Sequence, residues 1–332
     1  MPKKIVTLGE IMMRLSVAGH KKFVQAESLD VNYGGSEANV AVSLCNYHLN
    51  AIFITKLPNT ELGQAAINHL KRFGVDTEFI IRGGEKLGLY FLEPGLSIRS
   101  SQIIYDRAHS AIAEASPNEF DFDTILDGVD WFHTSSITPA LSDNAAIITE
   151  TALKTAKAKG ITTSIDLNYR KKLWSPEKAR KTMQQLYPYI DVCIGIDENA
   201  DLVSVTSSST PDSYTDALQQ MKDKFGFKYI ACTVREDKSA TENTCGAIAY
   251  DGKEFYKTKK YEVAVSDRIG SGDAFSGGLI YGLISNMHLK DAAEFGIAAA
   301  ALKHTIPGDV NHATIEDVTT LMNATSFGRV NR

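Results

Sequence analysis

The residues best suited to chemistry lie in a glycine-rich run, Asp267–Gly278, which follows a short β-like stretch and opens an apolar helical one. Gly270 and Gly272 let the backbone turn so that successive N–H groups converge. Those donors and the positive end of the following helix make a cradle for an anion such as phosphate. The run is not a P-loop, because no Lys-Ser or Lys-Thr ends it. It is not the dinucleotide fingerprint either, because Phe275 takes the place of the third glycine.

Asp273 directly follows these glycines, and a carboxylate beside a phosphate cradle repels phosphate unless it has another task. One such task is to accept the proton of an attacking hydroxyl while the amides of Gly270, Ser271 and Gly272 hold the transferred group. The other interpretation is that Asp273 caps the helix and interacts with its dipole. The first interpretation predicts phosphoryl transfer, and the second predicts no chemistry at this residue.

The elements that must position this run follow from alternating hydrophobic patterns. Short apolar runs alternate with helical stretches, which favours a mostly parallel sheet covered by helices on both faces, a three-layer α/β/α architecture. Strands are expected at residues 5–8, 51–55, 129–133, 161–167, 191–196, 228–234 and 261–265. Helices are expected from the cap Ser36 to residue 44, then at 61–73, 144–159, 216–225, 273–285 and 290–304, with another beginning at Ser175-Pro176.

Two stretches break this alternation, at about residues 11–33 and 86–107, and each is typical of two strands around a turn. Together they predict a small β-sheet lid over the carboxyl edge of the main sheet, where α/β proteins bind ligands. A lid with a partly apolar exposed face favours a homo-oligomer. The polar stretch Glu236–Cys245 is expected to be a flexible loop, and residues 1–332 are expected to form a single domain.

Composition narrows the function classes. The 332 residues carry 35 Lys and Arg against 40 Asp and Glu, a formal charge of −5, which argues against a nucleic-acid binder with a basic face. The four cysteines show no C-x-x-C pair or zinc spacing, as expected in a reducing compartment. Apolar runs all fall short of the ~20 residues of a membrane helix. We therefore expect a cytoplasmic protein that binds neither nucleic acid nor membrane.

Two signatures resemble those of one family. The run Gly270–Phe275 is similar to the C-terminal signature of the ribokinase-like (PfkB) carbohydrate kinases, and Gly34-Gly35-Ser36-Glu37-Ala38-Asn39 is similar to their N-terminal signature. The resemblance extends over nearly the whole chain, the lid stretches included. It implies a kinase with Asp273 as catalytic base, and a substrate lying against Gly34 and Gly35 near Asn39.

Three further segments most resemble the 2-keto-3-deoxygluconate kinases within that family: Tyr105–Ala111, Asp166–Lys171 and Ile306–Asp309. That substrate carries a carboxylate, which a guanidinium binds with two hydrogen bonds, so Arg107 and Arg170 are the candidates. Solvated positions in the lid and in a basic loop are the alternatives for these arginines.

Three more residues are implied as substrate ligands. Tyr90 and Tyr105 would reach the sugar from the lid, with cross-strand aromatic packing as the alternative. Asp309 would contact a substrate hydroxyl, with an ordinary turn aspartate as the alternative. The predicted reaction moves the γ-phosphoryl of ATP to the terminal hydroxyl and gives the 6-phosphate.

The resemblance also implies ATP contacts and a role for Mg²⁺. Asn168 and Arg170 would lie near the phosphates, and Thr233 and Arg235 would join the glycine-rich run. The family's Asn-x-x-Glu motif is altered here to Ile196-Asp197-Glu198-Asn199, so Glu198, or Asp197 in a shifted register, is the candidate metal residue. The alternative is Mg²⁺ held mainly by ATP and water, and a monovalent cation is a further candidate cofactor.

Three other functions compete with this one. A kinase of the same fold could act on fructose, a nucleoside or another sugar. A non-catalytic sugar- or nucleotide-binding regulator on the same scaffold has no need of Asp273. A nicotinamide dehydrogenase is disfavoured because no G-x-G-x-x-G turn follows the first strand.

Overall fold

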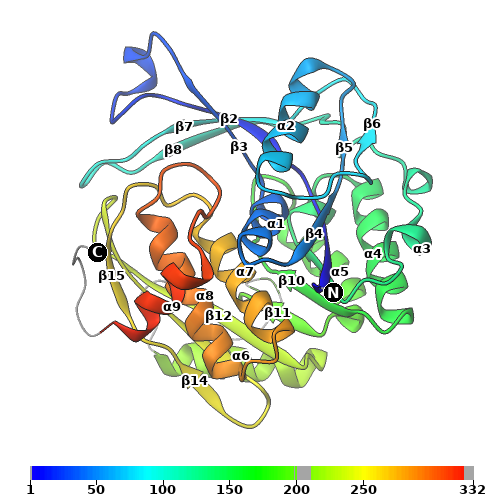
Figure 1. The fold of residues 1–332 in the computed structure, drawn as a ribbon, viewed down its shortest axis with the longest axis vertical. Coiled ribbons are helices and arrows are strands. Elements are labelled where there is room, and N and C mark those ends of the chain that lie inside the picture. Colours follow the sequence, from blue (N-terminus) through cyan, green and yellow to red (C-terminus); the bar gives the residue numbers. More distant parts are fainter. Residues whose placement is uncertain (1, 198, 200–210, 325–332) are drawn as a thin grey trace.

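The computed structural model describes residues 2–197, 199 and 211–324. Within them, nine strands form one main sheet in the order β14-β13-β12-β11-β10-β9-β1-β4, with β15 paired to β13 (Figure 1). The bounds of its strands are β1 Lys4–Leu8, β4 Asn50–Ile54, β9 Trp131–Ser135, β10 Thr162–Asp166, β11 Val192–Ile194, β12 Tyr229–Asp237, β13 Glu242–Tyr250, β14 Phe255–Lys257 and β15 Tyr261–Ala264.

Six neighbouring strands of the main sheet run parallel, in the order β4, β1, β9, β10, β11 and β12. Their apolar side chains suit a parallel sheet that is covered on both faces. Successive residues of a strand point to opposite faces, so a strand buried on both faces is continuously apolar. In β4, Ala51 and Phe53 enter one hydrophobic core while Ile52 and Ile54 enter the other. The expected mostly parallel sheet with two covered faces is thus confirmed.

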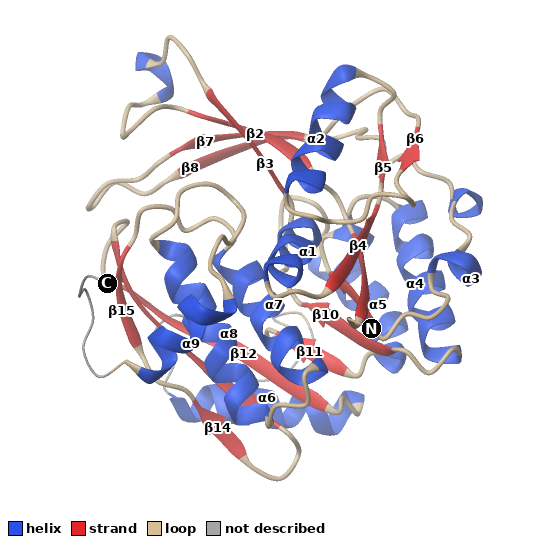
Figure 2. Cartoon of the chain, in the orientation of Figure 1, coloured by secondary structure: helices blue, strands red, loops and turns tan. Residues whose placement is uncertain are grey.

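Helices cover both faces of this sheet (Figure 2). On one side α1, α7 and α8 pack together, with α9 against α8, and on the other lie α4, α5 and α6. The bounds are α1 Ser36–Asn46, α2 Glu61–Arg72, α3 Phe122–Ile125, α4 Asp143–Ala158, α5 Pro176–Leu186, α6 Pro211–Phe225, α7 Ser271–Ile284, α8 Leu289–His304 and α9 Ile315–Asn323. Short 3₁₀ helices lie at Phe23–Gln25, Pro117–Glu119, Thr138–Ala140 and Tyr187–Tyr189.

The two lid stretches form a separate four-stranded sheet in the order β3-β2-β7-β8, seen at the top of Figure 1. Its strands are β2 Met12–Ser16, β3 Asp30–Gly34, β7 Leu89–Glu93 and β8 Gln102–Asp106, and β5 Lys56–Leu57 and β6 Ile81–Arg82 make a two-stranded sheet elsewhere. The register aligns Asn32, Arg14, Tyr90 and Tyr105 in one row across the lid. The adjacent row, Val31, Leu15, Phe91 and Ile104, faces the opposite way because the pleat alternates.

Two expectations about these elements are wrong, and one helix was not expected. The stretch Glu236–Cys245 is not a flexible loop: β12 and β13 pair there as an antiparallel hairpin out to Asp237 and Asn243. Polar residues conceal this strand in the sequence, although Asn243 and Thr244 are buried. Ser36 does not cap α1, because Gly35 is the N-cap and the Ser36 hydroxyl has another partner. The sequence pattern did not predict the helix α9.

No helix within the described ranges is long and apolar enough to cross a membrane. Four segments fall outside those ranges: residue 1, residue 198, residues 200–210 and residues 325–332.

Candidate active site

A cavity of about 590 Å³ lies where the carboxyl ends of the parallel strands meet the lid. Glu10 follows the end of β1, Asp166 ends β10, and Gly195 follows β11, so the main sheet supplies the floor. Tyr90 and Tyr105 reach the same cavity from β7 and β8 of the lid. This is the position expected for the ligand site of an α/β protein.

The cavity brings together fifteen residues to which the sequence assigned a role. They are Gly34, Gly35, Asn39, Tyr90, Tyr105, Arg107, Asn168, Arg170, Thr233, Arg235, Gly270, Ser271, Gly272, Asp273 and Asp309. The candidate metal residue Glu198 lies outside the described residues.

Asp273 lies in the first turn of α7 with its carboxylate buried. The Ser36 hydroxyl donates to its Oδ1 at 2.8 Å and the Asn39 amide donates to its Oδ2 at 2.7 Å. Burial raises the pKa of Asp273 above its ordinary value, while these two hydrogen bonds oppose that shift. The carboxylate is therefore oriented by residues of α1 and does not cap its own helix. A raised pKa suits a general base.

The start of α7 has the geometry of an anion cradle. Gly270 is the N-cap with φ +81°, a left-handed conformation that favours glycine, and a Cβ there would overlap the Asp309 carbonyl oxygen. A Cβ on Gly272 would meet no neighbour and would point into open space in the cavity. Beside it, Arg235 donates from Nη2 to the Ser271 hydroxyl at 3.0 Å. An anion at this point would face helix N–H groups and a guanidinium.

The lining of the cavity also includes a buried ion pair. Arg107, just after β8, donates from Nη2 to Glu10 Oε2, and both side chains are almost fully buried. Within the described residues, Arg107 Nε and Glu10 Oε1 have no partner. The Arg107 guanidinium also lies 5.5 Å from the centre of the Tyr105 ring. Arg107 is thus no solvated lid residue, and the pair leaves one donor and one acceptor unsatisfied.

The two lid tyrosines line the cavity and also pack against each other across the lid strands. Tyr90 and Tyr105 are cross-strand partners with ring centres 5.9 Å apart. The Tyr90 hydroxyl also donates to Asp309 Oδ2. Asp309 is buried rather than an exposed turn residue, and burial raises the pKa of its carboxyl.

Two further carboxylates lie on the floor of the cavity. Asp166 Oδ2 accepts from the Ser276 hydroxyl at 3.0 Å, and burial, followed by the nearby Asp273 charge, raises the pKa of Asp166 to about 7. Arg170 is exposed, and its charge lowers the pKa of both Asp166 and Asp273. Glu37 accepts from the Ser135 and Thr138 hydroxyls at 2.6 and 2.7 Å.

Of the altered Ile196–Asn199 stretch, the structure describes residues 196, 197 and 199, and none of these places a carboxylate in the cavity lining. Ile196 lines the cavity, whereas Asp197 does not. The Asp197 carboxylate accepts from the Tyr187 hydroxyl and from the backbone N–H of Asn199. No three His, Cys, Asp or Glu side chains gather into a metal cluster in the part of the chain that the structure describes. Mg²⁺ in phosphate-transferring sites is commonly held through one or two carboxylates together with the substrate phosphates.

Sequence reasoning assigned no role to four residues that shape this site: Glu10, Arg14, Asp166 and Asp267. Glu10 and Asp166 had a usable signal, because both lie at the carboxyl end of a parallel strand. Arg14 and Asp267 had none, since their roles depend on partners far away in the sequence.

An anion cradle beside a buried carboxylate, under a lid, defines a phosphotransferase for a small hydroxyl compound. The sequence model described as pfkB family carbohydrate kinase matches residues 2–315. The chain belongs to this family and is therefore a sugar kinase, an enzyme that transfers phosphate to an alcohol group.

Individual relatives agree with this placement. The structure of a 2-dehydro-3-deoxygluconokinase from Thermotoga maritima is 45% identical with a TM-score of 0.94, and the match covers 97% of this chain and 100% of that one. A 2-dehydro-3-deoxygalactonokinase of Haloferax volcanii is 35% identical over 318 residues, 96% of each chain. A 5-dehydro-2-deoxygluconokinase of Clostridium perfringens is 28% identical over 326 residues, 96% of this chain and 90% of its own.

Proposed function

We propose that the protein uses ATP to phosphorylate 2-keto-3-deoxygluconate, also called 2-dehydro-3-deoxygluconate, at its terminal hydroxyl, giving the 6-phosphate. The observation that carries this proposal is the polarity of the cavity. Its lining combines the N-terminus of α7 and Asp273 with the buried pair of Arg107 and Glu10. The names of the Thermotoga and Haloferax relatives support the same substrate class.

The two unsatisfied atoms of the Arg107–Glu10 pair suit a hydroxylated acid. Arg107 Nε needs an acceptor, which a substrate carboxylate supplies, and Glu10 Oε1 needs a donor, which a substrate hydroxyl supplies. A charge-assisted bond to the guanidinium is about twice as strong as a neutral one. A neutral sugar would leave Arg107 Nε without a charged acceptor. Arg170, which is exposed and also lines the cavity, is the second candidate guanidinium for the acid.

Catalysis would follow from alignment. With its acid end at Arg107, the substrate would place its terminal hydroxyl near Asp273, which accepts the proton. Phosphoryl transfer passes through a loose transition state in most analyses, so the proton leaves late and Asp273 need not be a strong base. The amides of Gly270, Ser271 and Gly272 would stabilise the charge on the transferred group, and the lid would exclude water.

ATP would occupy the side of the cavity bounded by Asn168, Arg170, Thr233 and Arg235. When bound with the nucleotide, Mg²⁺ would supply positive charge next to the phosphates. Glu198 as a metal residue and a monovalent-cation requirement remain predictions.

A coupled ADP-release assay over sugar acids and neutral sugars tests the proposal. We expect the two 2-keto-3-deoxy acids, the gluconate and its galactonate epimer, to give the highest kcat/KM, and fructose and nucleosides to give values near background. Preference for a neutral sugar would favour the alternative of a fructokinase or nucleoside kinase. No turnover with any acceptor, in folded protein that binds ATP, would favour a non-catalytic regulator.

Arg107→Ala sharpens this test, with Arg99→Ala as the matched control. Arg99 is also a lid arginine paired with a carboxylate, that of Glu93, but it does not line the cavity. Losing a hydrogen bond to a charged group, about 1.5–3 kcal/mol, should raise KM for the sugar acid roughly 10- to 150-fold. An equal effect on a neutral sugar would contradict the carboxylate assignment.

We also propose that copies of the chain associate through the lid. Val31 and Ile104, at the two ends of the outward row, are each 55% exposed, so an apolar stripe crosses the sheet. A contiguous exposed apolar patch is typical of an interaction site. The single domain spanning 1–332 and the cytoplasmic location remain predictions.

A further inference from the structure

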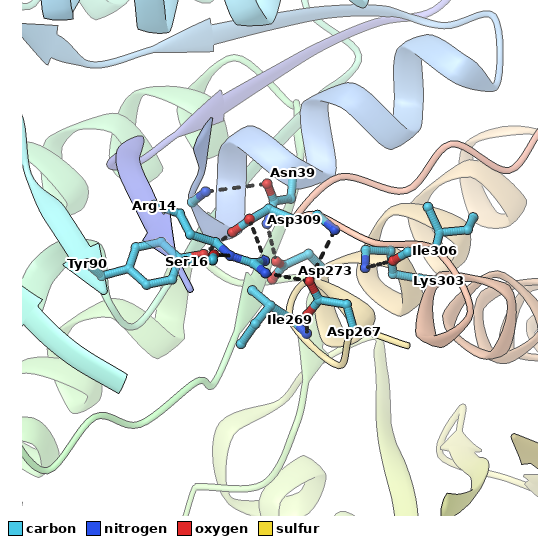
Figure 3. A network of polar contacts seen from close by, with 12 residues as sticks. Arg14, Ser16, Asn39, Tyr90, Asp267, Ile269, Asp273, Lys303, Ile306 and Asp309 are labelled. Carbon is cyan, nitrogen blue, oxygen red and sulfur yellow. Dashed lines mark hydrogen bonds and ion pairs between the residues drawn. The ribbon is translucent and has the colours of Figure 1, made fainter. Parts of the chain in front are cut away.

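The centre of the lid's inner row is a buried arginine that the reaction above does not use. Arg14, on β2, is only 5% exposed, and all three of its nitrogen positions have partners (Figure 3). Nε donates to the Ser16 hydroxyl at 2.7 Å, Nη1 to Asp309 Oδ1 at 3.0 Å and Nη2 to Asp267 Oδ2 at 2.6 Å. One guanidinium thus joins the lid to two segments from the other end of the chain.

Its first partner, Asp309, lines the cavity and has little freedom to turn. Arg14 binds one carboxylate oxygen and the Tyr90 hydroxyl binds the other. Side chains on Gly34 or Gly270 would overlap Asp309, so backbone packs against it from both of these positions. A carboxylate has about four lone-pair sites, so each oxygen keeps one for a hydroxyl in the cavity.

Its second partner, Asp267, begins the glycine-rich run. Asp267 Oδ1 accepts from the Ile269 amide at 3.0 Å, and Oδ2 accepts from the Gly308 amide at 3.1 Å. Asp267 therefore fixes both the entry to the anion cradle and the loop that carries Asp309. Arg14 holds this junction from the lid side.

The cluster is balanced in charge by a second buried cation. Lys303 is fully buried and donates from Nζ to the Ile306 carbonyl at 2.8 Å, next to the junction in Figure 3. Burial lowers the pKa of Lys303, and the charges of Asp267 and Asp309 oppose that shift. Arg14 is the cation that pairs directly with both carboxylates. Removing it would leave two buried negative charges without their ion-pair partner, which is strongly unfavourable.

We propose that Arg14 is a positioning residue of the phosphotransferase: it orients the Asp309 carboxylate toward the acceptor substrate and, through Asp267, ties the anion cradle to the lid. The proposal rests on the sugar-acid kinase function proposed above and on the expectation from the sequence that Asp309 contacts a substrate hydroxyl. It differs from a purely structural role because it predicts a selective effect on the acceptor substrate.

The test compares Arg14→Ala and Arg14→Lys with the control Arg99→Ala in the full-length protein, measuring kcat and KM for acceptor and for ATP. Loss of one charge-assisted hydrogen bond to Asp309 should lower kcat/KM for the sugar acid roughly 10- to 150-fold in Arg14→Ala. Most of this should come from KM of the sugar acid, with KM of ATP nearly unchanged. Arg14→Lys should fall between, because one ammonium cannot bind both carboxylates as the guanidinium fork does.

Chemical rescue adds a readout that a structural role would not move. Guanidinium chloride, far below denaturing concentrations, should lower KM for the sugar acid in Arg14→Ala but not in Arg99→Ala, and equal NaCl should not. If Arg14→Ala does not fold, Ser16→Ala replaces it, because that change removes only the acceptor for Nε and keeps both ion pairs. We then expect KM for the sugar acid to rise severalfold.

The outcomes separate the two proposals. Folded Arg14 or Ser16 variants with wild-type KM for the acceptor, and a loss of active fraction only, would overturn the positioning role. If the wild type prefers another acceptor, the sugar-acid assignment fails, and the same KM comparison with that acceptor still decides the role of Arg14.

Discussion

Replacing Asp273 with asparagine isolates its proposed role as a base. The substitution keeps size and shape, and the surrounding hydrogen bonds can be re-formed. The new carbonyl oxygen accepts from Asn39, and the new amide donates to Ser36, whose hydroxyl both donates and accepts. The substitution also removes a carboxylate whose charged form is disfavoured by burial, since burial raises the pKa of Asp273. Asp273→Asn should therefore fold at least as stably as the wild type above neutral pH.

The expected loss is confined to the chemical step. General-base catalysis contributes about 10²–10⁴-fold, so kcat should fall by that factor, or roughly 2.7–5.4 kcal/mol in activation free energy. The amides of Gly270 and Gly272 are unchanged, so calorimetry should give ATP affinity close to that of the wild type. Asp291→Asn is the matched control, since Asp291 is an exposed acid in the first turn of α8, away from the cavity.

One result would refute this reasoning. If Asp273→Asn retained near-normal kcat while the control did the same, Asp273 would be a helix-terminal acid without a chemical role. Its bonds to Ser36 and Asn39 would then serve to join α1 to α7.

Three further predictions concern the loop, the floor and the lid. Gly270→Ala should lower the free energy of unfolding by about 1–3 kcal/mol, because φ is +81° there and a Cβ would overlap the Asp309 carbonyl oxygen. Thermal unfolding measures this loss, and an unchanged Tm would contradict the close approach of Gly270 to Asp309. Burial raises the pKa of Asp166 from 3.8 to about 7. Between these two pH values the folded chain keeps a proton on Asp166 that the unfolded chain has released. Asp166 therefore makes folding less favourable as the pH rises through this range. Asp166→Asn should therefore stabilise the protein relative to wild type more at pH 8 than at pH 5, in matched thermal unfolding scans; the opposite order would reject the raised pKa. Val31→Asp with Ile104→Asp should shift light-scattering mass to that of one chain, whereas an unchanged mass would exclude the lid as the interface.

Local patterns in the sequence were enough to predict the cradle and the layers. The paired glycines before Asp273 require only a strand–turn–helix context, and the two-sided burial of β4 is visible as a continuous apolar run. The lid strands were also predictable, because they interrupt a regular alternation. These signals all lie within a few residues of one another, where backbone geometry determines the outcome.

The contacts that complete the site could not be predicted in the same way. Arg14 and Asp309 are 295 residues apart, and Arg107 and Glu10 are 97 apart. Nothing in the neighbourhood of Arg14 shows that its partners will be Asp267 and Asp309. The β12–β13 hairpin was missed for a related reason, since its polar residues are buried by tertiary packing that the local pattern does not reveal.

The most direct test of the sugar-acid kinase assignment is the product itself. Purified protein should be incubated with ATP, Mg²⁺ and 2-keto-3-deoxygluconate, and the mixture followed by ³¹P NMR with mass spectrometry. We predict a single phosphate monoester on the terminal carbon of the acid, formed together with ADP in equal amount. ADP without a sugar phosphate, or efficient phosphorylation of a neutral sugar but not of the acid, would contradict the account.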